Sequence, residues 1–158
     1  MTGVQTCALP ISNINPSDVS DVVGEYAQAD KTHAEAAIAA AQAALPAWAA
    51  TTPQQRADIL EAAGIELMAR REEIGQLLSR EEGKPLANGI AETMRAAQIF
   101  KFFAQEALRI EGVLVASVRA GVDVAITREP LGVVGIICPW NFPIAIPAWK
   151  LEIGRAHV

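Results

Sequence analysis

The sequence contains few cysteines, few aromatic residues and no excess of positive charge. Its 158 residues include two cysteines, Cys7 and Cys138, which are too few and too far apart for a metal site or a disulfide framework. Thirteen Lys and Arg residues stand against 18 Asp and Glu residues, and the resulting net charge of -5 argues against a nucleic-acid binder. No apolar run reaches the ~18 residues that a membrane-spanning helix needs. We therefore expect no nucleic acid and no membrane as partners, and no bound metal.

The composition that remains is typical of a globular domain. Hydrophobic residues make up 51% of the sequence and charged residues 20%, which excludes a disordered polar chain. A chain of roughly 150 residues can bury one core. Aromatic residues make up only 5% while alanine is abundant, and this combination favours closely packed helices.

The two ends lack the pattern of the interior. Residues 2–12 have neither a helical nor a strand period. Read as codons, the last seven residues, EIGRAHV, fit a short DNA whose opposite strand encodes, in a shifted frame, the string that ends at Ile11. That DNA resembles a sequencing adapter, so we expect residues 1–12 and 152–158 to be adapter-derived, with Cys7 and His157 carrying no chemistry. The alternative is an ordinary pair of tails.

Four helices are predicted between residues 30 and 110. One begins behind the N-cap Asp30, with Pro46 kinking or ending it; the next begins at Pro53 behind Thr52; the third begins near Arg71 and ends at Gly83; and the fourth runs from about Asn88 to Ile110. Apolar residues recur at helical spacing in all four. We expect His33 to be solvated on a polar helix face and Lys84 to be a helix-end charge.

Three segments have the pattern of strands. Val22–Ala27 is predicted as a short strand after a turn at Asn15–Asp18. Apolar and polar residues alternate over Val122–Thr127, which indicates a half-buried strand. Val133–Ile137 is a continuous apolar run interrupted by Gly135, which is typical of a strand buried on both faces of a parallel sheet.

The segment with the clearest potential for chemistry follows that third strand. It reads Cys138-Pro139-Trp140-Asn141-Phe142-Pro143, at the carboxyl end of the strand, where open α/β sheets bind their ligands. The two prolines stiffen the turn around Asn141, and a rigid turn that presents an amide suits a preorganised hydrogen-bond donor. The alternative is a well-packed turn with a structural asparagine.

Several strings resemble the aldehyde dehydrogenase superfamily. These are P-W-N-F-P at Pro139–Pro143, the following W-K pair, the lead-in TREPLGVVG at Thr127–Gly135, and EGKPL at Glu82–Leu86. The resemblance spans essentially Asn13 to Leu151. It implies an α/β fold: N-terminal helices, a β-hairpin arm and the first strand of a truncated, Rossmann-like cofactor-binding domain.

The strings N-I-N-P-S-D and S-V-R-A-G-V-D-V are similar to those of 2,5-dioxopentanoate (α-ketoglutaric semialdehyde) dehydrogenases. Another branch, such as a succinate semialdehyde or betaine aldehyde dehydrogenase, is the alternative. A non-catalytic helical interaction module is the alternative outside enzymes, and a strand that ends in P-W-N-F-P disfavours it.

The resemblance implies an oxidoreductase that uses NAD or NADP to convert a small-molecule aldehyde to a carboxylate through a cysteine thioester. Asn141 matches the family's oxyanion donor, and Lys150 matches a lysine near the nucleophile, with a purely structural role equally open. The expected cofactor-channel residues are Ile137, Cys138, Pro139, Trp140 and Asn141. The expected substrate-binding residues are Phe142 and Trp149.

The remaining family features are missing. Cys138 matches a position that is usually Thr, Ser or Val in the family, so we expect a buried small hydrophobe there and not the nucleophile. The nucleophilic cysteine, the glutamate base and a G-x-G-x-x-G fingerprint are absent from the sequence. The 158-residue chain is therefore expected to be inactive alone.

The strand Val122–Arg128 resembles an oligomerisation arm of the family. This resemblance implies a homodimer or homotetramer, and we expect a cytoplasmic protein.

Overall fold

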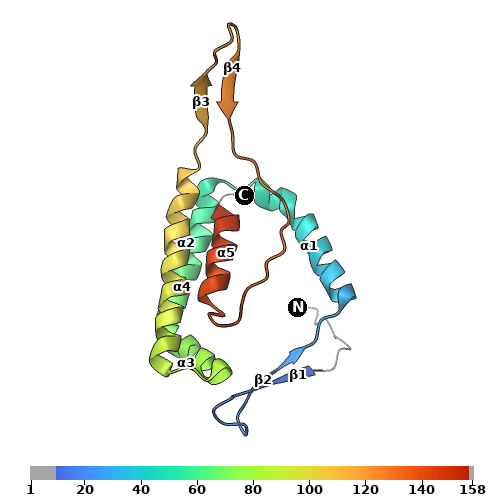
Figure 1. Ribbon diagram of the computed structural model, residues 1–158, viewed down its shortest axis with the longest axis vertical. Helices are drawn as coiled ribbons and strands as arrows, with labels where there is room; N and C mark the ends of the chain where they lie inside the picture. Colours follow the sequence, from blue (N-terminus) through green and yellow to red (C-terminus); the bar gives the residue numbers. More distant parts are fainter. Residues whose placement is uncertain (1–9, 157–158) are drawn as a thin grey trace.

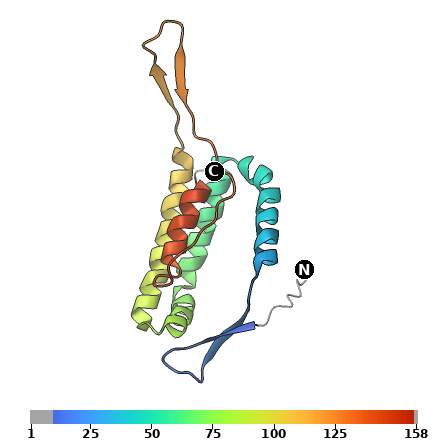
Figure 2. The ribbon, with the colours of Figure 1, turned by 45° about the vertical axis from the view of Figure 1, so that its right-hand side comes forward.

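The computed structural model describes residues 10–156, with side chains up to Leu151. In chain order the elements are β1 (Pro10–Ile14), β2 (Val22–Ala27), α1 (Lys31–Ala49), α2 (Pro53–Ala69), α3 (Arg71–Glu82), α4 (Leu86–Glu106), the 3-10 turn η1 (Ala107–Arg109), β3 (Val113–Ala116), β4 (Asp123–Ile126) and α5 (Ala145–Ala156). Helices α2, α4 and α5 lie side by side, α3 lies at one end of them, and the β3–β4 hairpin projects from the other end (Figure 1, Figure 2). No helix within the described residues is long and apolar enough to cross a membrane.

Local capping signals set the helix ends, as predicted. Asp30 and Thr52 each accept a hydrogen bond from the backbone N–H three residues on, and both complete a capping box. Gly83 ends α3 with a φ of 72°, a conformation that glycine adopts without strain. His33 completes the first box, since the Asp30 N–H donates to His33 Nδ1 at 3.2 Å, so this partly exposed side chain has a capping role beyond the predicted solvation.

Helix α1 continues through Pro46 to Ala49, so the proline does not end it. A proline removes one N–H from the helical ladder, and near the end of a helix few bonds remain to be lost. The N–H of Ala50 still donates to the Pro46 carbonyl at 3.2 Å. The side chains of α1 are all at least partly exposed.

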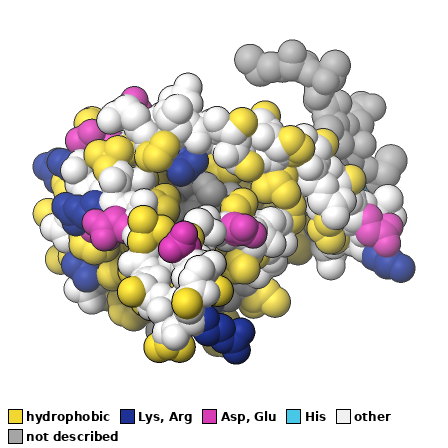
Figure 3. Space-filling view, turned by 90° about the horizontal axis from the view of Figure 1, so that it is seen from above, with side chains coloured by type: hydrophobic (Ala, Val, Ile, Leu, Met, Phe, Trp, Pro, Cys, Tyr) yellow, Lys and Arg dark blue, Asp and Glu magenta, His cyan; other side chains and the backbone are white. Residues whose placement is uncertain are grey.

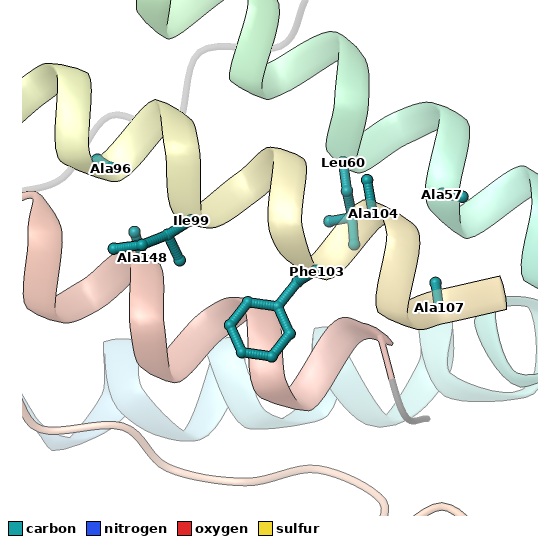
Figure 4. Packing of buried hydrophobic residues seen from close by; sticks show 8 residues of the cluster. All are labelled: Ala57, Leu60, Ala96, Ile99, Phe103, Ala104, Ala107 and Ala148. Carbon is teal, nitrogen blue, oxygen red and sulfur yellow. The ribbon is translucent and has the colours of Figure 1, made fainter. Parts of the chain in front are cut away.

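The core lies between α2, α4 and α5. Its buried residues form one cluster: Ala57, Leu60, Ala96, Ile99, Phe103, Ala104, Ala107 and Ala148 (Figure 4). Five of these eight residues are alanine, which confirms the prediction of closely packed helices. The Phe103 ring also packs edge-to-face against Trp149, with centroids 5.8 Å apart. The core thereby fixes α5 against α4.

Helices α3 and α4 cross at two glycines. A Cβ atom added to Gly75 would lie 2.7 Å from the backbone nitrogen of Ile90, and one added to Gly89 would collide with the Gly75 carbonyl oxygen. The obstacles at both positions include backbone atoms, which cannot move aside as a side chain can. This close approach holds the second turn of α3 against the first turns of α4.

The two hairpins differ from the sequence predictions. Strand β1 pairs antiparallel with β2, with Pro10 opposite Ala27 and an irregularity at Asn13/Ile14. Strand pairing thus includes Pro10–Ser12, for which no strand was predicted, because the ladder is made by backbone groups and does not require a side-chain pattern. The backbone of residues 152–156 likewise continues α5. Cys7 and His157 lie outside the described residues.

The second hairpin is the predicted arm. Strand β4 lies inside the predicted Val122–Thr127 segment and pairs with β3, Val113 lying opposite Ile126. Every residue of both strands is exposed, so the predicted half-burial was wrong for the described residues. The arm points away from the helices, and no described element covers either face (Figure 2).

Val133–Ile137 is not a strand in this structure, which corrects the predicted first strand of a parallel sheet. The sheets among the described residues are two separate antiparallel hairpins. A strand needs a neighbour that pairs with its N–H and C=O groups, and this segment has none among residues 10–156. All five of its residues are exposed.

An ion pair between Asp21 and Arg80 attaches the loop between β1 and β2 to α3, and its pH dependence can be tested. Arg80 donates from Nε and Nη2 to the two carboxylate oxygens of Asp21, at 2.9 and 2.6 Å. This hydrogen bonding, helped by Asn15, lowers the pKa of Asp21 from 3.8 to about 2. Because the folded-state pKa is the lower one, the contact is intact above pH 3.8 and is lost as the pH falls toward 2.

We expect a carboxyl-carbon NMR titration of Asp21 to give a midpoint near pH 2, whereas Arg80→Gln should return the midpoint toward 3.8. Arg70→Gln is the matched control, since Arg70 pairs with Glu73 on its own helix end. Equal Asp21 midpoints in the wild type and Arg80→Gln would contradict this attachment.

Candidate active site at the Asn141 turn

The Pro139–Pro143 turn lies where the long irregular segment after β4 reaches the start of α5 (Figure 1). It packs beside the C-terminal end of α3 and the first turns of α4. The close α3–α4 crossing at Gly75 and Gly89 therefore places the residues that hold the turn.

Lys84 is the first of these residues. Its Nζ pairs with Glu82 and lies 2.6 Å from Glu92 Oε2, and it reaches the backbone carbonyl of Asn141 at 3.4 Å. The same cation lies 5.2 Å from the centroid of the Phe142 ring. Burial alone would lower the pKa of Lys84, but the hydrogen bonds to Glu82 and Glu92 outweigh it, so the pKa is raised. The predicted helix-end charge is in fact the centre of a side-chain network.

Glu92 is the second, and the sequence reasoning missed it. Its side chain is 2% exposed. Oε1 accepts hydrogen bonds from the backbone N–H groups of Ile144 and Ala145, at 3.0 and 3.2 Å. A carboxylate at this position satisfies free N–H groups at the start of α5 and interacts favourably with the helix dipole. The available signal was an acidic residue on the buried face of α4, flanked by Gly89, Thr93 and Ala96.

Asn141 lines two clefts of about 370 and 540 Å³, which share Asn141 and Lys84. Phe142 lines the smaller cleft together with Arg95 and Asn88 from α4, and Trp140 lines the larger one. The structure thus brings the predicted oxyanion donor and one predicted substrate residue to a common cleft.

Trp149, the other predicted substrate residue, lies further along α5. The guanidinium carbon of Arg95 lies 5.6 Å from the centroid of its ring. A separate cleft contains Trp149 and Arg95 but not Asn141. Arg95 therefore makes a cation–π contact with Trp149 and lines the cleft that contains Phe142, although no sequence signal singled it out.

The predicted cofactor residues form an accessible segment. Ile137 is 90% exposed and Trp140 85% exposed, and Pro139 between them is also exposed. Cys138 is a free thiol of intermediate burial, so the expectation of a buried hydrophobe was wrong for the described residues. Lys150 donates from Nζ to the Ile137 carbonyl at 2.6 Å, a contact that fits the structural alternative for this lysine.

Comparisons with known proteins identify the class of this chain. Residues 4–156 match the sequence model of the aldehyde dehydrogenase family, and the chain belongs to that family of oxidoreductases. Members of the family use NAD or NADP. The predicted α/β class is confirmed: the helices and short strands of this chain match solved aldehyde dehydrogenase structures.

Two relatives and one structure show the particular similarity. The chain is 39% identical over 137 residues to an alpha-ketoglutarate semialdehyde dehydrogenase of Haloferax volcanii, covering 87% of this chain and 28% of that protein. It is 38% identical over 138 residues to a 1-pyrroline-5-carboxylate dehydrogenase of Anoxybacillus flavithermus, covering 87% and 27%. A crystal structure of an E. coli NADP dependent enzyme superimposes with a TM-score of 0.91 at 34% identity, covering 94% of this chain and 31% of that one. The chain thus spans less than a third of the length of these proteins.

Proposed function

We propose that this chain is the N-terminal part of an NAD- or NADP-dependent aldehyde dehydrogenase that oxidises an aldehyde to a carboxylate through a cysteine thioester. The observation that carries the proposal is that Asn141 borders two clefts on a turn that is bonded at Asn141 itself and directly after Pro143. In the proposed reaction a cysteine thiolate from the segment beyond Leu151 attacks the aldehyde carbon. The Asn141 amide donates a hydrogen bond to the oxygen that becomes negative. The bound nicotinamide supplies the hydride acceptor.

The cofactor would lie along Ile137–Asn141. The exposed apolar side chains of Ile137 and Trp140 suit contact with a flat ring. The Lys150 contact fixes the Ile137 carbonyl, so Lys150 would shape this channel and need not move a proton. Phe142 and Trp149 would line the path of the aldehyde.

The substrate we propose is 2,5-dioxopentanoate, an aldehyde that carries a carboxylate. The printed name of the Haloferax relative supports this choice. So does Arg95, because within the described residues it lines the Asn141 cleft and has no carboxylate in ion-pair distance, whereas Lys84 has two. A guanidinium with no carboxylate partner among the described side chains suits a substrate carboxylate and opposes a cationic betaine aldehyde. Succinate semialdehyde, which also carries a carboxylate, is the alternative.

Arg95→Met in the complete enzyme should therefore lower kcat/KM for 2,5-dioxopentanoate by about 10- to 100-fold, the scale of one lost hydrogen bond to a charged group. The value for an uncharged aldehyde of similar length should change less than about threefold. Lys101→Met, which removes an exposed cation from the same helix, is the matched control. An equal loss for charged and uncharged aldehydes would show that Arg95 does not recognise the carboxylate.

The 158-residue chain should show no aldehyde-dependent formation of NADH or NADPH. The chemistry requires a thiolate beside the oxyanion donor, and Cys138 lies in the proposed cofactor channel instead. The measurement is absorbance of the reduced cofactor at high protein concentration. Turnover that Cys138→Ala abolishes would make Cys138 the nucleophile and overturn the assignment.

The assembly proposed is a cytoplasmic homodimer or homotetramer. Hydrophobic side chains are spread over the surface seen from the hairpin end of the molecule (Figure 3). On the arm itself Leu114 and Val118 are almost fully exposed. An arm that carries such exposed hydrophobic side chains on both strands suits packing against further protein. Light scattering of the complete protein measures the number of subunits.

We also propose that residues 1–12 and 152–158 derive from a sequencing adapter. The support is the shared DNA reading of the two ends. Independent amplification and sequencing of the gene across both positions tests it, and recovery of the same terminal residues would refute it.

A further inference from the structure

We propose that Glu92 and Lys84 are positioning residues that set the orientation of the Asn141 turn and thereby the activity of its amide. The inference rests on the proposed function, since it assumes that Asn141 is the oxyanion donor. It adds two residues from another part of the chain, neither of which touches the reacting atoms.

Glu92 fixes the downstream end of the turn. Its Oε1 bonds to the N–H groups of Ile144 and Ala145, directly after Pro143. Proline itself has no N–H and a fixed φ, so the chain leaves the turn in one direction and is bonded at the next two residues. With 2% of its side chain exposed, the carboxylate cannot exchange these partners for water.

Lys84 bonds to the middle of the turn and stabilises Glu92. Its ammonium bonds to the Asn141 carbonyl at 3.4 Å and to Glu92 Oε2 at 2.6 Å. A buried carboxylate without a cation beside it is strongly unfavourable, so the Lys84 ammonium helps to keep the Glu92 side chain in this buried position. The contact with the Phe142 ring holds the residue after Asn141 as well. These attachments restrict the backbone from the Asn141 carbonyl to Ala145, while the Asn141 side chain can still rotate.

The consequence is geometric. An oxyanion donor works only when its hydrogen points at the position where negative charge develops, within about 0.5 Å. Removing either attachment lets the turn shift while its sequence stays unchanged. A misplacement of about 1 Å can reduce a rate by about 100-fold.

The first arm of the test uses the 158-residue chain and amide hydrogen exchange followed by NMR. Glu92→Ala should speed exchange at Ile144 and Ala145 by about tenfold or more, because those two N–H groups lose their acceptor. Glu92→Gln retains an acceptor oxygen and should stay within about threefold of the wild type. Glu61→Ala, on an exposed face of α2, is the matched control and should change neither amide. Unchanged exchange in a folded Glu92→Ala protein would overturn the proposal.

The second arm measures single-turnover formation of NADH or NADPH in the complete enzyme. Lys84→Met should slow acylation by about 10- to 100-fold with little change in cofactor affinity, and Lys84→Arg should restore part of the rate. In an Asn141→Ala background, Lys84→Met should slow it by less than about twofold further, because a residue that acts through Asn141 has nothing left to position. Full additivity of the two substitutions would refute positioning. If the wild-type enzyme oxidises no aldehyde, the proposed function fails and with it the catalytic half of the inference, while the exchange arm still decides whether Glu92 holds the turn.

Discussion

Replacing Asn141 with alanine in the complete enzyme should lower the acylation rate by two to three orders of magnitude, the range typical of a lost oxyanion donor. Alanine has no side-chain donor, Pro139 and Pro143 have no N–H groups, and Lys84 is already bonded to Glu82 and Glu92, so none of these residues replaces the lost amide. Cofactor affinity should change little, since the backbone of the proposed channel is retained.

Three measurements separate this effect from a loss of structure. Single-turnover kinetics report the acylation rate, a cofactor titration reports affinity, and a thermal melt reports stability, which should fall by no more than about 1–2 kcal/mol. Asn88→Ala, which changes another asparagine of the same cleft, is the matched control. A mutant that acylates at the wild-type rate but melts much earlier would make Asn141 a structural residue.

Replacing Gly75 with alanine should have the largest effect on stability. The added Cβ meets the backbone of Ile90 at 2.7 Å, so α3 and α4 must separate along their contact. Overpacking typically costs about 1–3 kcal/mol, and a rigid backbone obstacle places Gly75→Ala near the upper end. For a chain of this size the thermal midpoint should fall by roughly 5–10 °C.

Two other glycines supply graded controls. Gly64→Ala meets the Cγ of Lys101 at 2.9 Å and the Ala97 carbonyl oxygen at 3.0 Å, which are less close than the contacts at Gly75, and should cost less. Gly135→Ala meets nothing within 4 Å and should change the free energy of unfolding by no more than about 0.5 kcal/mol. Urea unfolding of the three variants measures the order, and an equal effect at Gly75 and Gly135 would contradict the close crossing.

The helix ends and the turn could be predicted from the sequence because they are formed by residues that are close together along the chain. The caps at Asp30 and Thr52 and the stop at Gly83 involve residues within one helical turn, so a short window contains the whole interaction. The Pro139–Pro143 turn was recognisable for the same reason. Val133–Ile137 shows the limit, since its apolar pattern fits a strand but a strand also requires a partner from elsewhere.

The unpredicted part of the site is long-range. Glu92 accepts a hydrogen bond from Ile144, which is 52 residues away in the sequence. The residues around Glu92 in α4 do not indicate which N–H groups will donate to it. Arg95 has an equally distant partner in Trp149. Helical spacing placed these residues on α4, but only the packing of α5 against α4 decided what they would contact.

The bond between Glu92 and Ile144 closes a loop that contains the entire β3–β4 hairpin. The entropy of closing a loop grows only with the logarithm of its length, so even a doubling would cost about 0.6 kcal/mol. The arm projects away from the helices and touches no part of the Asn141 turn (Figure 1). Insertions and deletions at the hairpin tip are therefore decoupled from the geometry of the turn, which leaves evolution free to vary the arm while the chemistry stays constant.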